Sequence, residues 1–194
     1  MEKRIIGITG GVGSGKSTVL EYLEKECGAC IIQADLVARE LMEPGGSSYR
    51  AVAAEFGEGI LASDGSIDRG ALAAIVFSDE EKLARLNALT HPLVKEEVQR
   101  RMAQTDKALV VFESAIPREA RMRDLCDEIW FVHVPVETRI ERLMASRGYS
   151  RQKCQAIMDN QLADEVFAQL ADHVIENGGS PEETRKQVAA LLPE

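Results

Sequence analysis

A glycine-rich run near the amino terminus has the residue types and spacing of a phosphate-binding loop. Residues Gly10 to Ser17 read GGVGSGKS, which matches the pattern G-x-x-x-x-G-K-[ST], and Thr18 follows. Glycines adopt backbone dihedral angles that other residues avoid, so successive amide N–H groups can turn inward around phosphate oxygens. The lysine of this pattern can reach the β- and γ-phosphates of a nucleotide, and the hydroxyl can hold Mg²⁺. We therefore predict a nucleotide-binding loop.

Each residue of the loop has an expected task. Lys16 is expected to serve catalysis as a point charge on the phosphates, and Ser17 to be the Mg²⁺ ligand. The alternative is a strand-to-helix turn that binds nothing, which the glycines, the lysine and the two hydroxyls together disfavour. The nucleotide contacts are expected from Gly11, Val12, Gly13, Ser14, Gly15, Lys16, Ser17 and Thr18.

The elements that must position this loop alternate between strand and helix. Short apolar runs predict strands at residues 4–9, 29–33, 108–113, 129–134 and 173–176. Amphipathic segments predict helices over 17–26, from 36 until Pro44, over 135–145 and after the capping box at Ser180. This alternation indicates an α/β fold with a parallel sheet.

The stretch from about 47 to 104 is different, because it is helical throughout and lacks a strand. Ser78 and Glu81 fit a capping box, which predicts a helix start there. Pro92 biases His91 away from helical geometry, so a break in the helix is expected. A strand-free stretch between strands of one sheet is typical of an inserted subdomain.

Composition excludes several classes of protein. Hydrophobic residues make up 45% and charged residues 28%, which is unlike a disordered chain. The net charge of −9 argues against nucleic-acid and membrane partners, while a local pocket can still bind a small polyanion. The amino-terminal apolar run is too short for a signal peptide, and no stretch approaches the roughly 18 apolar residues of a membrane span. Four cysteines in a chain of this size favour reduced thiols and a cytoplasmic location.

Other motifs narrow the class of nucleotide enzyme. The N-K-x-D motif with which switch GTPases read guanine does not occur in the sequence. A motor ATPase is typically longer and ends an apolar strand with Asp-Glu. Among the classes of P-loop protein, these observations favour the small-molecule kinases.

Several segments resemble the dephospho-CoA kinase family. They follow the family's order and spacing over nearly the whole chain: IGITGGVGSGKST at 6–18, ADLVARELMEPG at 34–45, FGEGILASDGSIDRGALAAIVF at 56–77, LTHPLV at 89–94 and ADHVIENGGSPEE at 171–183. The resemblance implies transfer of the ATP γ-phosphate to the ribose 3′-hydroxyl of dephospho-CoA, the last step of coenzyme A synthesis.

The resemblance also implies a domain organisation and partners. It implies one P-loop kinase domain, with its core at about 1–46 and 105–194, a helical CoA-binding insertion at about 47–104 and a mobile lid at about 140–165. ATP, Mg²⁺ and dephospho-CoA are the expected small molecules, and the chain is expected to be a monomer or a weak homo-oligomer. The competing functions are another P-loop nucleoside or small-metabolite kinase, and a nucleotide-binding regulator without catalysis.

Asp35 is the expected catalytic base, because a carboxylate after a strand of an α/β sheet can accept the proton of an attacking hydroxyl. The alternative is that Asp35 only caps the following helix. The chain departs from the family at Gln33, where an Asp-x-Asp pair is common. Arg39, one helical turn after Asp35, can pair with it or hold substrate phosphate.

Two arginines, Arg142 and Arg147, flank a helix break and resemble the lid of a kinase, where guanidinium groups meet the transferring phosphoryl group. The alternative is a solvated helix face on which Glu137 and Glu141 pair with them. Arg142 is the expected catalytic arginine, and Arg147 is expected to bind nucleotide.

Three further residues have open roles. Glu113 closes a strand and either assists the metal or is structural, in a segment (ESAIPREA) that varies from the family's Asp-x-Pro-Leu-Leu. Asn177 resembles the adenine-side loop of the family, with a plain turn residue as the alternative. His91 either contacts CoA or is structural, whereas His133 and His173 are expected only to pack.

Overall fold

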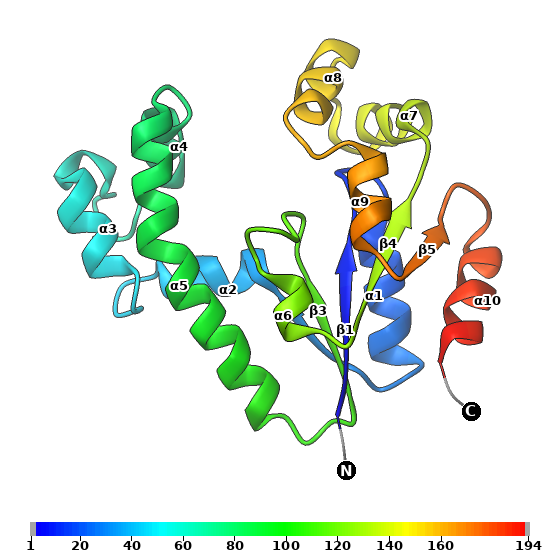
Figure 1. The fold of residues 1–194 in the computed structure, drawn as a ribbon. Coiled ribbons are helices and arrows are strands. Elements are labelled where there is room, and N and C mark those ends of the chain that lie inside the picture. Colours follow the sequence, from blue (N-terminus) through cyan, green and yellow to red (C-terminus); the bar gives the residue numbers. More distant parts are fainter. Residues whose placement is uncertain (1–2, 193–194) are drawn as a thin grey trace. The chain divides into compact units, whose positions relative to one another are not determined.

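The computed structural model describes residues 3–192 and contains a five-stranded parallel sheet, which confirms the predicted α/β class (Figure 1). The strand order across the sheet is β2-β3-β1-β4-β5. The strands are β1 (Arg4–Thr9), β2 (Cys30–Gln33), β3 (Leu109–Glu113), β4 (Glu128–His133) and β5 (His173–Glu176). No helix of the described chain has the length and apolar character that crossing a membrane requires.

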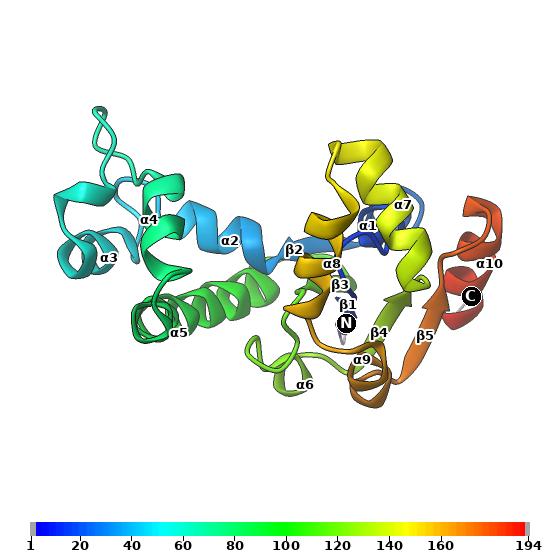
Figure 2. The same ribbon diagram turned by 90° about the horizontal axis from the view of Figure 1, so that it is seen from above.

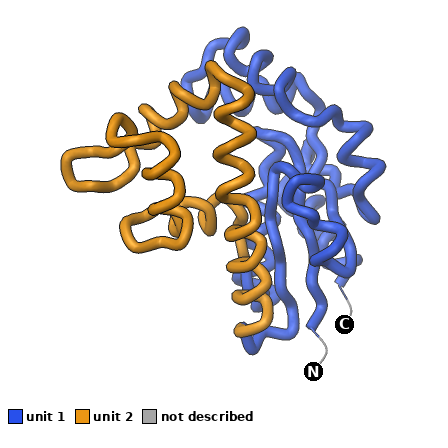
Figure 3. Tube along the Cα trace, turned by 60° about the vertical axis from the view of Figure 1, so that its left-hand side comes forward, with its two compact units in different colours: residues 1–31, 105–194 blue, residues 32–104 orange. Residues whose placement is uncertain are grey.

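The chain divides into two compact units, which Figure 3 colours separately. The first comprises residues 1–31 and 105–194, and the second residues 32–104, so β2 lies across the boundary. The helices of the first unit are α1 (Lys16–Lys25), α6 (Met122–Leu125), α7 (Val136–Arg147), α8 (Arg151–Asp159), α9 (Asp164–Leu170) and α10 (Pro181–Leu191). The second unit holds α2 (Ala34–Leu41), α3 (Tyr49–Phe56), the 3₁₀ turn η1 (Glu58–Ile60), α4 (Arg69–Val76) and α5 (Glu80–Gln104).

One face of the first unit's sheet packs against α1 and α10. Alternate residues of a strand point to opposite faces, so Ile6 and Ile8 of β1 share this side with Trp130 of β4. Leu23 of α1 and Val188 of α10 complete the same buried cluster. The apolar face of α1 therefore anchors this helix, which begins at the glycine-rich loop, against the sheet.

The opposite face packs against α6 and α9 (Figure 2). A Cβ atom at Gly7 would overlap the Met122 side chain of α6, so glycine is required there for a close approach. Phe131 of β4 stacks on Phe167 of α9 with ring centroids 5.2 Å apart. Helices on both faces explain why the strands read as continuous apolar runs.

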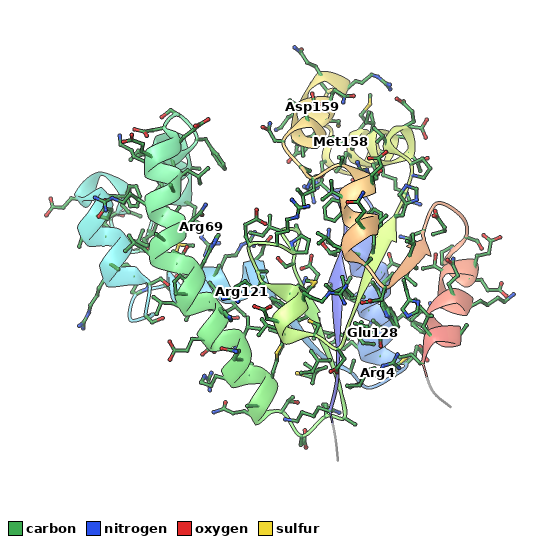
Figure 4. All side chains as sticks on the ribbon, viewed as in Figure 1. Arg4, Arg69, Arg121, Glu128, Met158 and Asp159 are labelled. Carbon is green, nitrogen blue, oxygen red and sulfur yellow. The ribbon has the colours of Figure 1, made fainter. Side chains whose placement is uncertain are left out.

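The amino-terminal ends of β1 and β4 are joined by an ion pair. The Arg4 Nε donates to Glu128 Oε1 over 2.7 Å, and the two side chains lie together in Figure 4. The Arg4 Nη2 also donates to the Leu191 carbonyl of α10 over 2.9 Å. This edge of the sheet is thus tied together by structural contacts.

Two local expectations in the second unit are wrong. The cap of α5 is Asp79, not Ser78, since the Asp79 Oδ1 accepts from the backbone N–H groups of Glu81 and Lys82 at 3.0 and 3.2 Å. The expected break at His91-Pro92 is also wrong, because α5 runs through Pro92. Packing of α5 against α2, α3 and α4 outweighs the cost of about 3 kcal/mol of a proline inside a helix.

The first unit brings smaller differences. The short helix α6 was not expected, because four residues are too few to show a helical period. The predicted interruption after α7 is confirmed: Gly148 ends the helix with φ 63°, and the Ser150 hydroxyl caps α8 by accepting from the Lys153 N–H over 3.2 Å. The capping box of α10 is also confirmed, with reciprocal contacts between Ser180 and Glu183.

This capping box leads to a stability prediction. Ser180→Ala removes the acceptor for the Glu183 N–H and should lower the free energy of unfolding by about 1 kcal/mol. Urea titration followed by fluorescence of Trp130, the single tryptophan, reports on the unit that contains α10. Ser63→Ala, at an exposed loop position, is the control. Equal stability of both variants would contradict the prediction.

Candidate functional site

The carboxyl ends of the strands in the first unit converge on one edge of the sheet. The glycine-rich loop follows β1, Glu113 ends β3, and Asn177 follows β5. The Thr9 hydroxyl donates to the Ser114 carbonyl over 2.8 Å and joins the ends of β1 and β3. This edge is where open α/β sheets bind their ligands.

Three glycines of the loop have positive φ, with values of 150° at Gly10, 82° at Gly13 and 79° at Gly15. These angles are strained for residues with a Cβ atom, so the glycine pattern is a backbone requirement. Helix α1 begins at Lys16, and no side chain caps its first turn. The first turn of α1, with the positive end of the helix dipole, is therefore suited to binding an anion.

Lys16 lies over the loop with most of its side chain covered. Its ammonium donates to the Gly10 carbonyl over 2.7 Å and lies 3.8 Å from Glu113 Oε1. The Glu113 side chain is only 9% exposed, so the lysine offsets the charge of a buried carboxylate. A lysine on a flexible stem can exchange such acceptors for phosphate oxygens.

Asn177 supports the loop from the other end of the sheet. Its Nδ2 donates to the Ser14 carbonyl over 2.7 Å, and its Oδ1 accepts from the Thr184 hydroxyl over 2.8 Å. Asn177 is 6% exposed, and a Cβ atom at Gly15 would overlap its amide. Asn177 is therefore more than a plain turn residue, because it holds the loop backbone in place.

Arg142 joins the same group, whereas Arg147 does not contact it. The Arg142 Nη2 donates to the Asn177 carbonyl over 2.9 Å. Arg147 lies over the Tyr149 ring, 5.9 Å from its centroid. The alternative pairing of these arginines with Glu137 is not seen within residues 3–192, where Glu137 instead accepts from Arg151 over 2.7 Å.

Three residues near the loop were not found from the sequence. The Gln161 Oε1 accepts from the Val12 N–H over 3.0 Å, and the buried Arg139 packs on Gly11 and pairs with Asp164. A signal for Arg139 was present, since it precedes Arg142 by three residues, a helical spacing that puts both on one face. Gln161 and Asp164 carried no such signal.

Three residues singled out in the sequence, Asp35, Arg39 and His91, belong to helices of the second unit. Helix α2 begins at Ala34 with Gln33 as its N-cap residue, so Asp35 lies inside the first turn. The alternative that Asp35 is the helix cap is therefore wrong. Among the described side chains, no ion pair joins Asp35 and Arg39, and His91 lies within α5.

The site offers a hard cation few ligands from the protein. The described chain has no group of three or more His, Cys, Asp or Glu side chains that could hold a metal. The Ser17 residue, by contrast, is exposed at the start of α1 and has a hydroxyl oxygen to offer. One protein oxygen suits Mg²⁺, which in nucleotide sites is held largely by phosphates and water.

The cysteines bring no reactive thiol to this edge. All four are free, as expected. Burial raises the pKa of the Cys126 thiol to about 12, and burial also raises the pKa of Cys27. Protonated thiols at neutral pH are weak nucleophiles.

Comparison with known proteins gives consistent matches. The model of the dephospho-CoA kinase family matches residues 4–183. A dephospho-CoA kinase of Carboxydothermus hydrogenoformans is 44% identical over 191 residues, which cover 97% of this chain and 92% of the relative. The crystal structure of TT1252 from Thermus thermophilus is 33% identical, with a TM-score of 0.86 and 100% of both chains covered. Dephospho-CoA kinase from Campylobacter jejuni shares the fold at 23% identity, with a TM-score of 0.70 and 97% of both chains covered.

The bonds of Asn177 lead to a second stability prediction. Asn177→Ala leaves the Ser14 carbonyl without this donor, at about 1–3 kcal/mol for a buried group, and removes the closer of the two acceptors of the Thr184 hydroxyl. We expect a marked drop in the free energy of unfolding, measured by urea titration with Trp130 fluorescence. Asn160→Ala, at the exposed end of α8, is the matched control. If both variants unfold at the same urea concentration, Asn177 does not hold the loop.

Proposed function

The chain belongs to the dephospho-CoA kinase family, and from that premise we propose how its residues transfer the γ-phosphate of ATP to the ribose 3′-hydroxyl of dephospho-CoA. This transfer completes coenzyme A synthesis. The observation that carries the proposal is the uncapped start of α1 beneath a glycine loop, with Lys16 over it. Such an arrangement brings local positive potential to a triphosphate in a chain of net charge −9.

The nucleotide phosphates are bound by backbone and side chain together. Backbone N–H groups of the loop and of the first turn of α1 donate to phosphate oxygens, and the Lys16 ammonium exchanges the Gly10 carbonyl for the β- and γ-phosphates. Because charge accumulates on the bridging oxygen as ADP leaves, a cation fixed there stabilises the transition state more than the ground state.

Ser17 is the protein ligand proposed for Mg²⁺, through its exposed hydroxyl oxygen. The bound ion would neutralise charge on the β- and γ-phosphates. Ser17 lies in the first turn of α1, directly after the loop that is proposed to bind the same phosphates, so its hydroxyl is placed to hold the ion.

Asp35 is proposed as the base. Its carboxylate accepts the proton of the 3′-hydroxyl as that oxygen bonds to the γ-phosphorus, and the bond from phosphorus to the β-bridging oxygen breaks to release ADP. Support comes from the residue type, its place in the first turn of α2 directly after β2, and the family resemblance of residues 34–45.

Arg142 and Arg147 are proposed to act from a lid formed by the segment of about 140–165. Arg142 donates to the Asn177 carbonyl, and a guanidinium there can extend a second edge to the transferring phosphoryl group. Arg147 is the last residue of α7, directly before the helix end at Gly148.

Asn177 is proposed to serve nucleotide binding indirectly, by holding the backbone of the loop. By holding the Ser14 carbonyl it orients that peptide unit, whose N–H is that of Gly15 in the proposed phosphate-binding set. The adenine-side role implied by the family resemblance is compatible with its place after β5.

The acceptor distinguishes this function from its two competitors. We expect ADP release by the purified chain with ATP, Mg²⁺ and dephospho-CoA, and a product with phosphate on the ribose 3′ carbon by ³¹P NMR. Release with another nucleoside or metabolite, and not with dephospho-CoA, would favour a different small-molecule kinase. Nucleotide binding without any release would favour a regulator.

Removing Lys16 should separate catalysis from folding. Lys16→Ala should lower turnover by about 10³-fold, because the charge on the transferring phosphate loses its partner. Lys25→Ala, at the exposed far end of α1, is the control and should keep full turnover. Near-normal transfer by a folded Lys16→Ala protein, checked by circular dichroism, would refute this role.

Asp35→Asn tests the base. The amide keeps the shape of the side chain but cannot take a proton, so turnover should fall by about 10²-fold or more while ATP and dephospho-CoA bind with unchanged affinity. Calorimetry and steady-state rates measure the two effects, with Asp106→Asn at an exposed loop position as the control. Wild-type turnover of the variant would assign the proton to another group.

The lid can be followed by hydrogen exchange. Residues 140–150 should gain protection when ATP and dephospho-CoA are both present, because closure must exclude water before transfer. Arg142→Ala should lower turnover much more than ATP affinity, and Arg123→Ala should change neither. If protection of residues 140–150 does not change and Arg142→Ala has wild-type turnover, the segment is not a lid and its arginines lie on an ordinary solvated helix face.

A further inference from the structure

Arg139 is a charged residue in an unusual place. It lies on α7 with its side chain only 5% exposed. Its one hydrogen bond within residues 3–192 runs from Nη1 to Asp164 Oδ1 over a long 3.3 Å. The Nε atom is enclosed and has no acceptor in the described chain. A buried guanidinium with an unsatisfied donor is costly and needs an explanation.

The guanidinium of Arg139 abuts the glycine loop. Gly11 does not have a positive φ, so its backbone does not require glycine. A Cβ atom at Gly11 would, however, overlap Arg139 Nη1, so the absent side chain is what gives the guanidinium its space. The Arg139 Cβ would also lie 3.2 Å from a Cβ atom at Gly13. Helix α7 therefore meets the loop through this residue.

The partner of Arg139 is shared with other groups. The Asp164 Oδ2 lies 3.6 Å from His133 Nε2, while His133 Nδ1 lies 2.8 Å from Glu176 Oε2. His133 thus takes part in a polar cluster, contrary to the expectation that it only packs. Since Asp164 faces two groups, Arg139 keeps donor capacity that no described residue meets.

The Gln161–Asp164 segment connects α8 with α9 and reaches the loop twice. At one end, the Gln161 Oε1 accepts from the Val12 N–H over 3.0 Å. At the other end, Asp164 holds the guanidinium that rests on Gly11. The position of this segment therefore sets the position of Arg139 relative to the loop.

We propose that Arg139 is a further phosphate-binding residue of the nucleotide site, and that Asp164 is a positioning residue that holds it against the loop. The inference rests on the nucleotide site described under the proposed function. A guanidinium presents planar pairs of donors that match two phosphate oxygens, and phosphate supplies the acceptors that the Nε lacks. The guanidinium already lies against Gly11 of the loop, which is the part of the nucleotide site closest to it in the described contacts.

The test compares ADP and ATP affinities by calorimetry with unfolding followed by Trp130 fluorescence. Arg139→Met should weaken both nucleotides by about tenfold or more, since charge-assisted hydrogen bonds are lost. Arg139→Lys keeps the charge without the planar fork and should fall between Arg139→Met and wild type. Asp164→Asn should lower stability with a smaller loss of affinity. Arg123→Met, which breaks another arginine–aspartate pair of the same unit, should keep wild-type affinity.

Two outcomes would overturn the proposal. If Arg139→Lys binds ADP and ATP as wild type does, phosphate does not contact the guanidinium, and this variant decides the matter even when Arg139→Met fails to fold. If Arg139→Met and Asp164→Asn lose equal affinity in proportion to stability, the pair only joins α7 to α9. Unchanged ADP affinity in Lys16→Ala would instead refute the nucleotide site itself.

Discussion

The start of α1 has to remain accessible to an anion, because the positive end of the helix dipole is what attracts a phosphate group. This constraint fits the missing side-chain cap at Gly15 and the positive φ angles of three loop glycines. It also explains how a chain of net charge −9 can attract a polyanion. The helix dipole acts on a phosphate at short range. Surface charges farther away than about 8–10 Å are screened by salt, so the net charge of the chain opposes binding only weakly.

A loop with so little internal hydrogen bonding needs support from outside. Asn177 supplies it by bonding the Ser14 carbonyl, and its own orientation is fixed by Thr184 of α10. Gln161 bonds the Val12 N–H, and Arg139 fills the space that Gly11 leaves open. The support thus comes from two parts of the first unit: β5 with α10, and α7 with the segment after α8.

Local patterns were sufficient where short-range physics decides the structure. The loop, the bounds of β1 and β5 and the capping box at Ser180 depend on neighbouring residues, and all were predicted. An expectation failed where tertiary packing decides, because α5 passes through Pro92 while three helices pack against it. The hydrogen bond from Asn177 to the loop joins residues far apart in sequence, so its geometry could not be read from a local pattern. Arg139 was missed because a buried arginine looks like a surface one in sequence. The proposed role of Arg139 follows only from its contacts in the fold, with Gly11 of the loop and with Asp164.

The central claim is that the fold prepares the loop to bind phosphate, with no rearrangement of the sheet. Amide chemical shifts measured by ¹⁵N NMR during titration with ATP and Mg²⁺ test it most directly. The account predicts large shifts for the N–H groups of residues 11–18 and for the Asn177 side-chain amide, with little change at the buried residues of β1 and β4. Shifts spread through the sheet with none in the loop would contradict it.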